Sequence, residues 1–124
     1  MRVMARILVV DDDPDILELV SLKLRASGHH VTAVETGEAA RDVLSQDSGL
    51  DLLVVDHMMP GMTGVDLVRL LRAEGGLLPV IMLTARSQER DLESAFTAGV
   101  DDYLTKPFSP RELAVRVSAL LNRR

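Results

Sequence analysis

Short runs of apolar residues alternate along this chain with longer segments in which apolar residues recur at helical spacing. The runs lie at 6–10, 30–34, 52–55, 79–83 and 102–105. Each run is continuous rather than alternating, which is typical of strands buried on both faces of a parallel sheet. We therefore predict five strands, each followed by a helix.

The segments between the runs carry the start and stop signals of helices. Asp13 is placed to cap a first helix with Pro14 at its first position, and Gly28 is placed to end it. The other helices are predicted from about Thr36 to Leu44, from Val65 to Ala73, at about 86–98, and at 109–121 with Ser109 as the cap. Strands that alternate with helices imply right-handed crossovers and a sheet covered on both faces. The pattern therefore predicts a doubly wound fold of the α/β class.

The composition fits one domain. The chain has 124 residues, of which 47% are hydrophobic, so we expect a single domain over 1–124 with a core from about 5 to 122. Aromatic residues contribute 2% and there is no Trp. The interior is therefore expected to consist of aliphatic and Met side chains, as in layered α/β proteins.

Charge and residue usage exclude several classes of function. A net charge of −5 argues against a nucleic-acid surface, so any contact with DNA would belong to another domain. Without Cys there is neither a disulfide framework nor a thiolate metal site. No apolar run approaches the roughly 20 residues that span a bilayer, and the N-terminus lacks a secretory signal. A cytoplasmic protein without a membrane partner is expected.

Polar residues follow four of the apolar runs. Asp11 and Asp12 follow the first run, Asp56 the third, Thr84 the fourth and Lys106 the fifth. Because the carboxyl ends of parallel strands lie at one edge of a sheet, these side chains are expected to converge. Three carboxylates repel one another unless a cation joins them, and hard oxygen ligands suit Mg²⁺ or Mn²⁺.

Such a set is suited to phosphoryl transfer. Asp56 would act as the in-line nucleophile and become an aspartyl phosphate, while the metal and Lys106 neutralise charge on the phosphoryl oxygens. The Thr84 hydroxyl can donate a hydrogen bond to an oxyanion. An acyl phosphate adds charge and acceptor oxygens, so it can serve as a temporary switch.

Four motifs carry a resemblance to a known family: "ILVVDDD", "LLVVDHMMPGMTG", "PVIMLTA" and "GVDDYLTKPF". In this order and spacing, the chain resembles the receiver domain of bacterial response regulators, the CheY-like superfamily, over essentially its whole length. The resemblance implies a flavodoxin-like (βα)5 fold with strand order 2-1-3-4-5. It also implies Mg²⁺-dependent phosphoryl transfer from a phosphohistidine on a partner histidine kinase to Asp56. The domain would be a signalling phosphoacceptor rather than an enzyme that acts on a separate substrate.

The resemblance also implies the metal ligands and the positions that tune the lifetime of the phosphorylated state. Asp11 and Asp12 match the acidic pair, with Asp12 more directly on the metal, and Met58 would lend only its backbone carbonyl. Met58, two residues beyond Asp56, and Arg86, two beyond Thr84, are expected to tune the lifetime. An apolar side chain at 58 cannot orient an attacking water, so a lifetime longer than that of the fast chemotaxis-type members is predicted.

Thr84 and Tyr103 match the switch pair of the family, in which the hydroxyl turns toward the phosphoryl group and the ring moves inward. Lys106-Pro107 matches a Lys-Pro step whose peptide bond is usually cis in the family, an isomer that only X-Pro adopts readily.

The segment "DDYLTKPFSPREL" resembles the winged-helix transcription-factor branch of the family, the OmpR/PhoB type. In that branch activation pairs two receivers through the fourth helix, the fifth strand and the fifth helix. Asp101, Asp102, Glu112 and Arg116 are therefore candidates for ion pairs in a homodimer. Leu92 departs from the pattern, because the branch usually carries a basic residue there. A C-terminal output domain beyond this chain is expected, with a stand-alone receiver as the alternative.

Several residues have plainer interpretations. Asp13 and Asp15 are expected to act as a helix cap and a first-turn charge rather than as metal ligands. His29, His30 and His57 are predicted to face solvent or strand edges, since no two have the spacing of metal ligands on one element.

Two other functions stay open. A haloacid-dehalogenase-like phosphatase also forms an aspartyl phosphate with Mg²⁺, and its nucleophile here would be Asp11 of Asp11-Asp12-Asp13. That family usually shows Thr or Val where this chain has Asp15. A receiver-like adaptor that is never phosphorylated is the other alternative. A dinucleotide-binding fold is weaker, because no G-x-G-x-x-G follows the first run.

Overall fold

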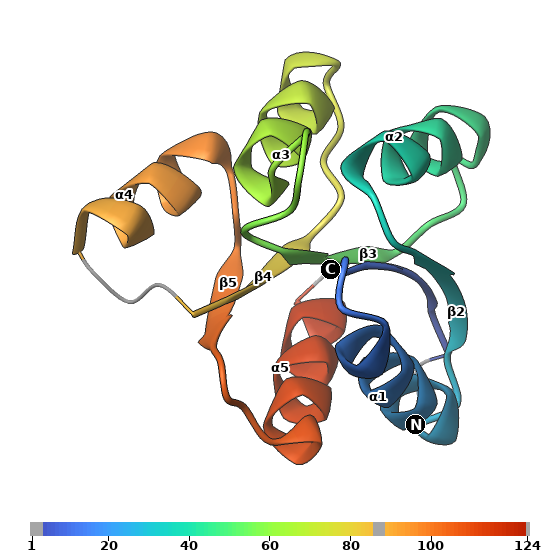
Figure 1. Ribbon diagram of the computed structural model, residues 1–124. Coiled ribbons are helices and arrows are strands. Elements are labelled where there is room, and N and C mark those ends of the chain that lie inside the picture. The colour runs from blue at the N-terminus through green and yellow to red at the C-terminus, as the bar shows by residue number, and fades with distance from the viewer. Residues whose placement is uncertain (1–3, 86–88, 124) are drawn as a thin grey trace.

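The computed structural model describes residues 4–85 and 89–123. The described residues form one parallel sheet with the order β2-β1-β3-β4-β5. Its strands are β1 (Arg6–Val10), β2 (His30–Val34), β3 (Leu52–Asp56), β4 (Val80–Thr84) and β5 (Asp102–Thr105). This is the predicted class and the strand order that the resemblance implies (Figure 1).

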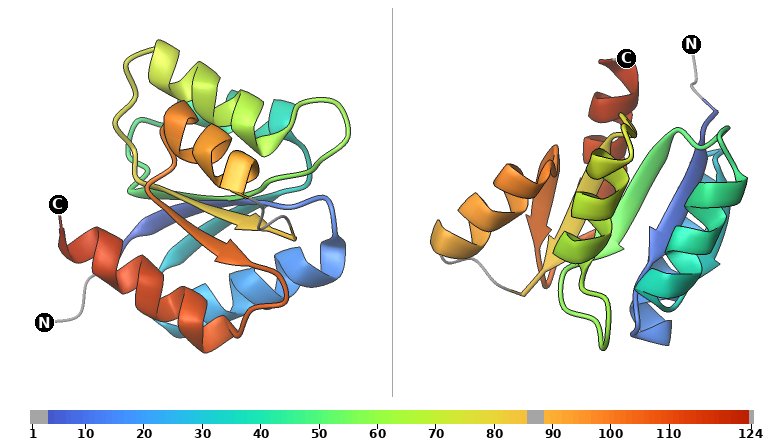
Figure 2. Two further views of the ribbon diagram at one scale, coloured as in Figure 1. Left: turned by 90° about the vertical axis from the view of Figure 1, so that its left-hand side faces the viewer. Right: turned by 90° about the horizontal axis from the view of Figure 1, so that it is seen from above.

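Helices cover both faces of the sheet and make three layers. The described helices are α1 (Pro14–Ala26), α2 (Gly37–Gln46), α3 (Gly64–Ala73), α4 (Glu89–Ala98) and α5 (Pro110–Asn122). Helices α1 and α5 lie on one face, and α2, α3 and α4 lie on the other (Figures 1 and 2). The predicted helix at 86–98 is described from Glu89 onward, and residues 86–88 lie outside the described residues.

Side-chain alternation along the strands divides the interior into two apolar clusters. Ile7 and Val9 of β1 pack with α1 and α5, whereas Leu8 and Val10 pack on the side of α2, α3 and α4. All four side chains are fully buried. Strands β1, β3 and β4 are therefore apolar at successive positions because both of their faces are covered.

Strand β2 departs from the prediction of a strand buried on both faces. Three of its five residues are exposed, and Val31 and Val34 are half-buried. The reason is its place at the edge of the sheet, where it pairs with β1 alone.

Capping side chains set the helix starts. The Asp13 carboxylate accepts a hydrogen bond from the backbone N–H of Asp15 at 2.9 Å, which confirms it as the cap of α1. Ser109 caps α5 in the same way through the N–H of Glu112, at 2.9 Å. Helix α3 begins one residue earlier than predicted, because Thr63 and Asp66 form a reciprocal capping box.

Candidate functional site

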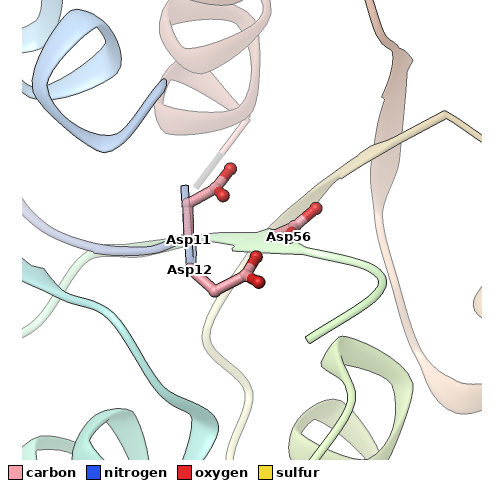
Figure 3. Close-up of side chains that lie close together, drawn as sticks. All are labelled: Asp11, Asp12 and Asp56. Atoms are coloured by element: carbon pink, nitrogen blue, oxygen red, sulfur yellow. The ribbon is translucent and has the colours of Figure 1, made fainter. Parts of the chain in front are cut away.

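The functional candidates lie at the carboxyl edge of the sheet, as predicted. Asp56 and Thr84 are the last residues of β3 and β4, and Asp11 directly follows β1. One carboxylate oxygen from each of Asp11, Asp12 and Asp56 lies within 4.8 Å of the others. Figure 3 shows these three carboxylates on the neighbouring ends of β1 and β3. Two chain segments that are far apart in the sequence thus contribute to a single acidic cluster.

Asp11 and Asp12 have different surroundings. The side chain of Asp11 is fully buried, and its Oδ1 accepts a hydrogen bond from the N–H of Asp13 at 2.9 Å. Asp12 is exposed, so it faces the side from which a ligand would arrive. Asp13 is occupied as the cap of α1, which agrees with its predicted role outside the cluster.

Lys106 joins the two buried carboxylates. Its Nζ donates to Asp56 Oδ1 at 2.9 Å and to Asp11 Oδ2 at 3.2 Å. The backbone N–H of Lys106 donates to the carbonyl of Thr84 at 2.7 Å, which keeps the segment after β5 beside β4. The Lys106-Pro107 peptide bond is cis, as the resemblance implies.

Burial and the neighbouring charges shift the pKa values of Asp56 and Lys106. Burial raises the pKa of Asp56 to about 6; the hydrogen bond from Lys106 opposes this rise, and the nearby charge of Asp11 and the contact with Asp12 add to it. Burial alone would lower the pKa of Lys106, but Asp56 and Asp11 outweigh it and hold this pKa above its usual value. Lys106 therefore offsets only part of the cost of burying the Asp56 carboxylate.

The donor set fits a hard divalent cation. Its side-chain donors are carboxylate oxygens, the ligands that Mg²⁺ and Mn²⁺ prefer. Among the described residues this is the one group of three or more acidic or imidazole side chains close enough to hold a metal. The side chain of Met58 is 49% exposed and lies away from the core, and the role of its carbonyl stays a prediction. Arg86, the other residue predicted to tune the lifetime of the phosphorylated state, lies outside the described residues.

His57 is buried beside Thr84, and the prediction that it faces solvent or a strand edge was wrong. Its Nδ1 lies 3.0 Å from the Thr84 Oγ1. Asp56 pairs with Leu83 in the sheet, so the next residues, His57 and Thr84, lie side by side. Alternation along β3 indicates only the face, since His57 has the parity of Leu53 and Val55, which face the side of α2, α3 and α4; the register of β3 and β4 decides its partner.

His29 is a second correction. It is buried, and its Nδ1 accepts a hydrogen bond from the backbone N–H of Ala5 at 3.1 Å, so it ties the residue before β1 to the residue before β2. His30 is exposed, as predicted.

The loop after β3 is held at both ends. The N–H of Gly64 donates to the carbonyl of His57 at 2.9 Å, and a Cβ at Gly64 would overlap the carbonyl oxygen of Asp56. Glu38 at the start of α2 accepts from the N–H of Met62 at 3.1 Å. Glycine at 64 therefore allows α3 to begin against the end of β3.

Tyr103 lies on the surface formed by α4, β5 and α5. It is half-buried, and its ring centroid is 6.1 Å from that of Phe96 on α4. Phe96 was not among the residues predicted to have a functional role. Its helical position carried no signal, and only the fold brings α4 beside β5.

The candidate dimer residues have partners within the chain. Arg116 lies 3.0 Å from Asp102 and 3.8 Å from Glu112, so it links β5 to α5. Asp101 accepts from the N–H of Val80 at 2.8 Å and pairs with Arg72 at 3.1 Å. Asp102, Glu112 and Arg116 therefore share one surface, whereas the Asp101 carboxylate contacts the amino end of β4.

Comparison with known proteins agrees with this geometry. Residues 7–118 match the family model of the response regulator receiver domain. The chain is 42% identical over 118 residues to the DNA-binding response regulator MtrA of Mycolicibacterium smegmatis, covering 95% of this chain and 51% of MtrA. It thus spans about half the length of the curated relatives it matches.

Solved structures show the same fold. The receiver domain of the Francisella response regulator 1452 has a TM-score of 0.91 at 35% identity, with 96% of this chain and 98% of that chain covered. The BeF3-activated receiver domain of DrrB has a TM-score of 0.85 at 38% identity, with 97% and 99% covered. The chain belongs to the response regulator receiver domain family, the receivers of two-component systems. Among the described residues, no helix is long and apolar enough to cross a membrane.

Proposed function

We propose that this domain accepts a phosphoryl group on Asp56 from a phosphohistidine of a sensor histidine kinase. The observation that carries the proposal is the position of Lys106, whose Nζ bonds both Asp56 and Asp11 at the rim of an acidic cluster. A buried carboxylate with a raised pKa is unfavourable for stability, so its presence at this edge suits a chemical role.

The chain's own residues would perform the transfer in one in-line step. An Asp56 oxygen attacks phosphorus and the bond from phosphorus to the kinase imidazole nitrogen breaks, so the electron pair of that bond returns to the imidazole. Lys106 holds a positive charge 2.9 Å from the acceptor carboxylate and balances charge that moves onto the phosphoryl oxygens. Asp11, Asp12, Asp56 and the Met58 carbonyl would hold Mg²⁺ or Mn²⁺, which supplies further neutralisation of the phosphoryl oxygens.

The signal would then leave through α4, β5 and α5. Thr84 is the last residue of β4, and its hydroxyl would turn to donate to a phosphoryl oxygen on Asp56. Tyr103 on the neighbouring strand would move inward from its place beside Phe96. The exposed surface that changes would carry a phosphorylation-dependent homodimer, with Asp102, Glu112 and Arg116 available to exchange intrachain pairs for pairs between subunits.

The whole regulator and its surroundings are part of the same proposal. MtrA is a DNA-binding response regulator, and this chain covers about half of it. We infer that the domain acts with a C-terminal output domain that contacts DNA, while the acidic receiver itself does not. A cytoplasmic location, where kinase and output target would meet, belongs to this proposal.

The phosphatase alternative has less support. Its nucleophile would be Asp11, whose side chain is fully buried and has both oxygens engaged, by the N–H of Asp13 and by Lys106. An adaptor that is never phosphorylated would not require Asp56, Thr84 and Lys106 to converge at one edge of the sheet.

The test is the mass of the intact protein after incubation with acetyl phosphate and Mg²⁺. We expect one phosphoryl adduct that is absent without metal and absent in Asp56→Asn. An adduct that persists in Asp56→Asn would indicate another nucleophile, with Asp11→Asn as the next variant. No adduct from acetyl phosphate or from a phosphorylated kinase would contradict the proposal and favour the adaptor.

A further inference from the structure

His57 forms a hydrogen bond with Thr84 of the proposed switch pair, yet His57 itself has no role in the proposed function. The distance between His57 Nδ1 and Thr84 Oγ1 is 3.0 Å, and both residues are buried. Thr84 is the residue whose hydroxyl is proposed to turn toward a phosphoryl group on Asp56. In this structure that hydroxyl contacts the imidazole instead.

The backbone of His57 is hydrogen-bonded on both sides. The N–H of His57 donates to the carbonyl of Leu83 at 2.9 Å, and its carbonyl accepts from the N–H of Gly64 at 2.9 Å. The first bond attaches His57 to β4, and the second attaches it to the start of α3. With its backbone attached at these two points and its side chain buried, His57 presents its imidazole to Thr84 from a fixed position on the chain.

Alternation along the strands places Thr84 and Asp56 on different faces of the sheet. Thr84 has the parity of Met82, which packs on the side of α2, α3 and α4, whereas Asp56 has the parity of Val54, which packs on the side of α1 and α5. A phosphoryl group on Asp56 would therefore require Thr84 to leave its contact with His57. Thr has a few discrete χ1 positions, so this change is a step between rotamers rather than a gradual movement.

We propose that His57 is a positioning residue that holds the Thr84 hydroxyl in its unphosphorylated orientation and thereby sets how readily the domain switches. This inference rests on the proposed function of Asp56 and Thr84. Both imidazole tautomers act alike, because Nδ1 can either donate to Oγ1 or accept from it. In each case the bond must break before Thr84 can serve the phosphoryl group.

The expected effect follows from the populations of the two Thr84 orientations. A ligand that needs the switched state binds more weakly by the fraction of molecules already in that state. Loss of one neutral hydrogen bond that favours the unswitched state should raise this fraction by about three- to tenfold. His57→Phe should therefore tighten binding of the phosphoryl mimic beryllofluoride, in excess Mg²⁺, by about three- to tenfold.

The test is a double-mutant cycle measured by calorimetric titration with beryllofluoride. His57→Phe is compared with wild type, and again in the background of Thr84→Val, which has no hydroxyl to hold. We expect tightening only when Thr84 is present. His57→Asn should restore an affinity near wild type, because its amide places a hydrogen-bonding atom where Nδ1 lies. His29→Asn, which removes a buried imidazole at the opposite edge of the sheet, should leave the affinity unchanged.

An equal effect of His57→Phe in both backgrounds, or no tightening with Thr84 present, would overturn the proposal. A second measurement works without any phosphoryl ligand, namely the χ1 population of Thr84 from three-bond NMR couplings in the metal-free protein. Wild type and His57→Asn should show one dominant rotamer, and His57→Phe a mixture. A single unchanged Thr84 rotamer in His57→Phe would contradict the proposal that His57 fixes the orientation of the Thr84 hydroxyl. Failure of wild type to bind beryllofluoride or take up phosphate would instead contradict the function of Asp56, whatever the rotamers show.

Discussion

The ammonium of Lys106 lies 2.9 Å from the carboxylate of Asp56 and 3.2 Å from that of Asp11, across a separation of 50 and 95 residues. This cation only partly offsets the burial of the Asp56 carboxylate, whose pKa stays raised to about 6. The domain therefore keeps a buried carboxylate that is unfavourable for stability and whose charged form a divalent cation would stabilise.

The first prediction is that Asp56→Asn stabilises the domain at neutral pH without metal. The pKa of Asp56 is raised from 3.8 to about 6, so the folded state binds a proton more tightly than the unfolded state. Stability from this group is present below the ordinary pKa, falls as pH rises, and is fully lost above about pH 6. Urea unfolding should show a gain of about 1–3 kcal/mol for Asp56→Asn at neutral pH and little gain at about pH 4. The exposed Asp42→Asn is the control and should show no gain in stability at either pH. A loss of stability in Asp56→Asn at neutral pH would contradict the conclusion that the charged Asp56 is unfavourable for folding.

The second prediction concerns the metal. Protons compete with Mg²⁺ for Asp56, so affinity should fall by up to about tenfold for each pH unit below about 6. Mg²⁺ should raise the thermal midpoint of wild type at neutral pH and do so less at about pH 5. Asp12→Asn, which alters an exposed ligand, should weaken binding while leaving the folded state intact. Affinity that is independent of pH over this range would argue against Asp56 as a ligand.

The third prediction tests the pairing of Lys106. Lys106→Ala leaves two buried carboxylates without their cation and should destabilise the domain by about 2 kcal/mol at neutral pH. In the Asp56→Asn background the same change should cost less, by about 1 kcal/mol, because one of those charges is gone. Chemical denaturation of the four proteins gives the coupling directly. Costs that simply add would show that the two groups do not interact.

The fourth prediction concerns the lifetime of the phosphorylated state. Met58 presents an apolar, half-exposed side chain two residues beyond Asp56. Asn at this position could orient an attacking water, so Met58→Asn should speed loss of the phosphoryl group. A time course of intact mass after removal of acetyl phosphate measures it, with Met58→Leu as the apolar control. Equal rates for Asn and Leu would exclude this position from the control of lifetime.

The fifth prediction concerns a buried hydroxyl on α1. Ser21 is 2% exposed, and its Oγ has no hydrogen-bond partner among the described residues. Ser21→Ala should therefore stabilise the domain, whereas an exposed Ser118→Ala on α5 gains only helix propensity. We expect the difference between the two gains to be about 1 kcal/mol by chemical denaturation. An equal gain for both variants would show that the Ser21 hydroxyl is satisfied in solution.

Local chemistry made the architecture and the main site predictable. Strands β1, β3 and β4 are buried on both faces, so their apolar runs are unbroken, and the helices begin at capping residues such as Asp13 and Ser109. Parallel strands deliver the residues that follow them to one edge, so Asp11, Asp56 and Lys106 could be placed together without coordinates. The cluster and its lysine follow from this rule.

What the sequence by itself determined were the elements, their order and the residues at the carboxyl edge, because these depend on periodicity and on neighbours in the chain. Only the tertiary structure decided which polar side chains are buried. His57 lies against Thr84 because β3 and β4 pair in one particular register. Asp101 meets Arg72 because α3 packs against α4, which brings Arg72 beside the turn that leads to β5. Strand β2 is largely exposed because it is the edge of the sheet. Burial and pairing of this kind depend on contacts between distant segments, which no local pattern specifies.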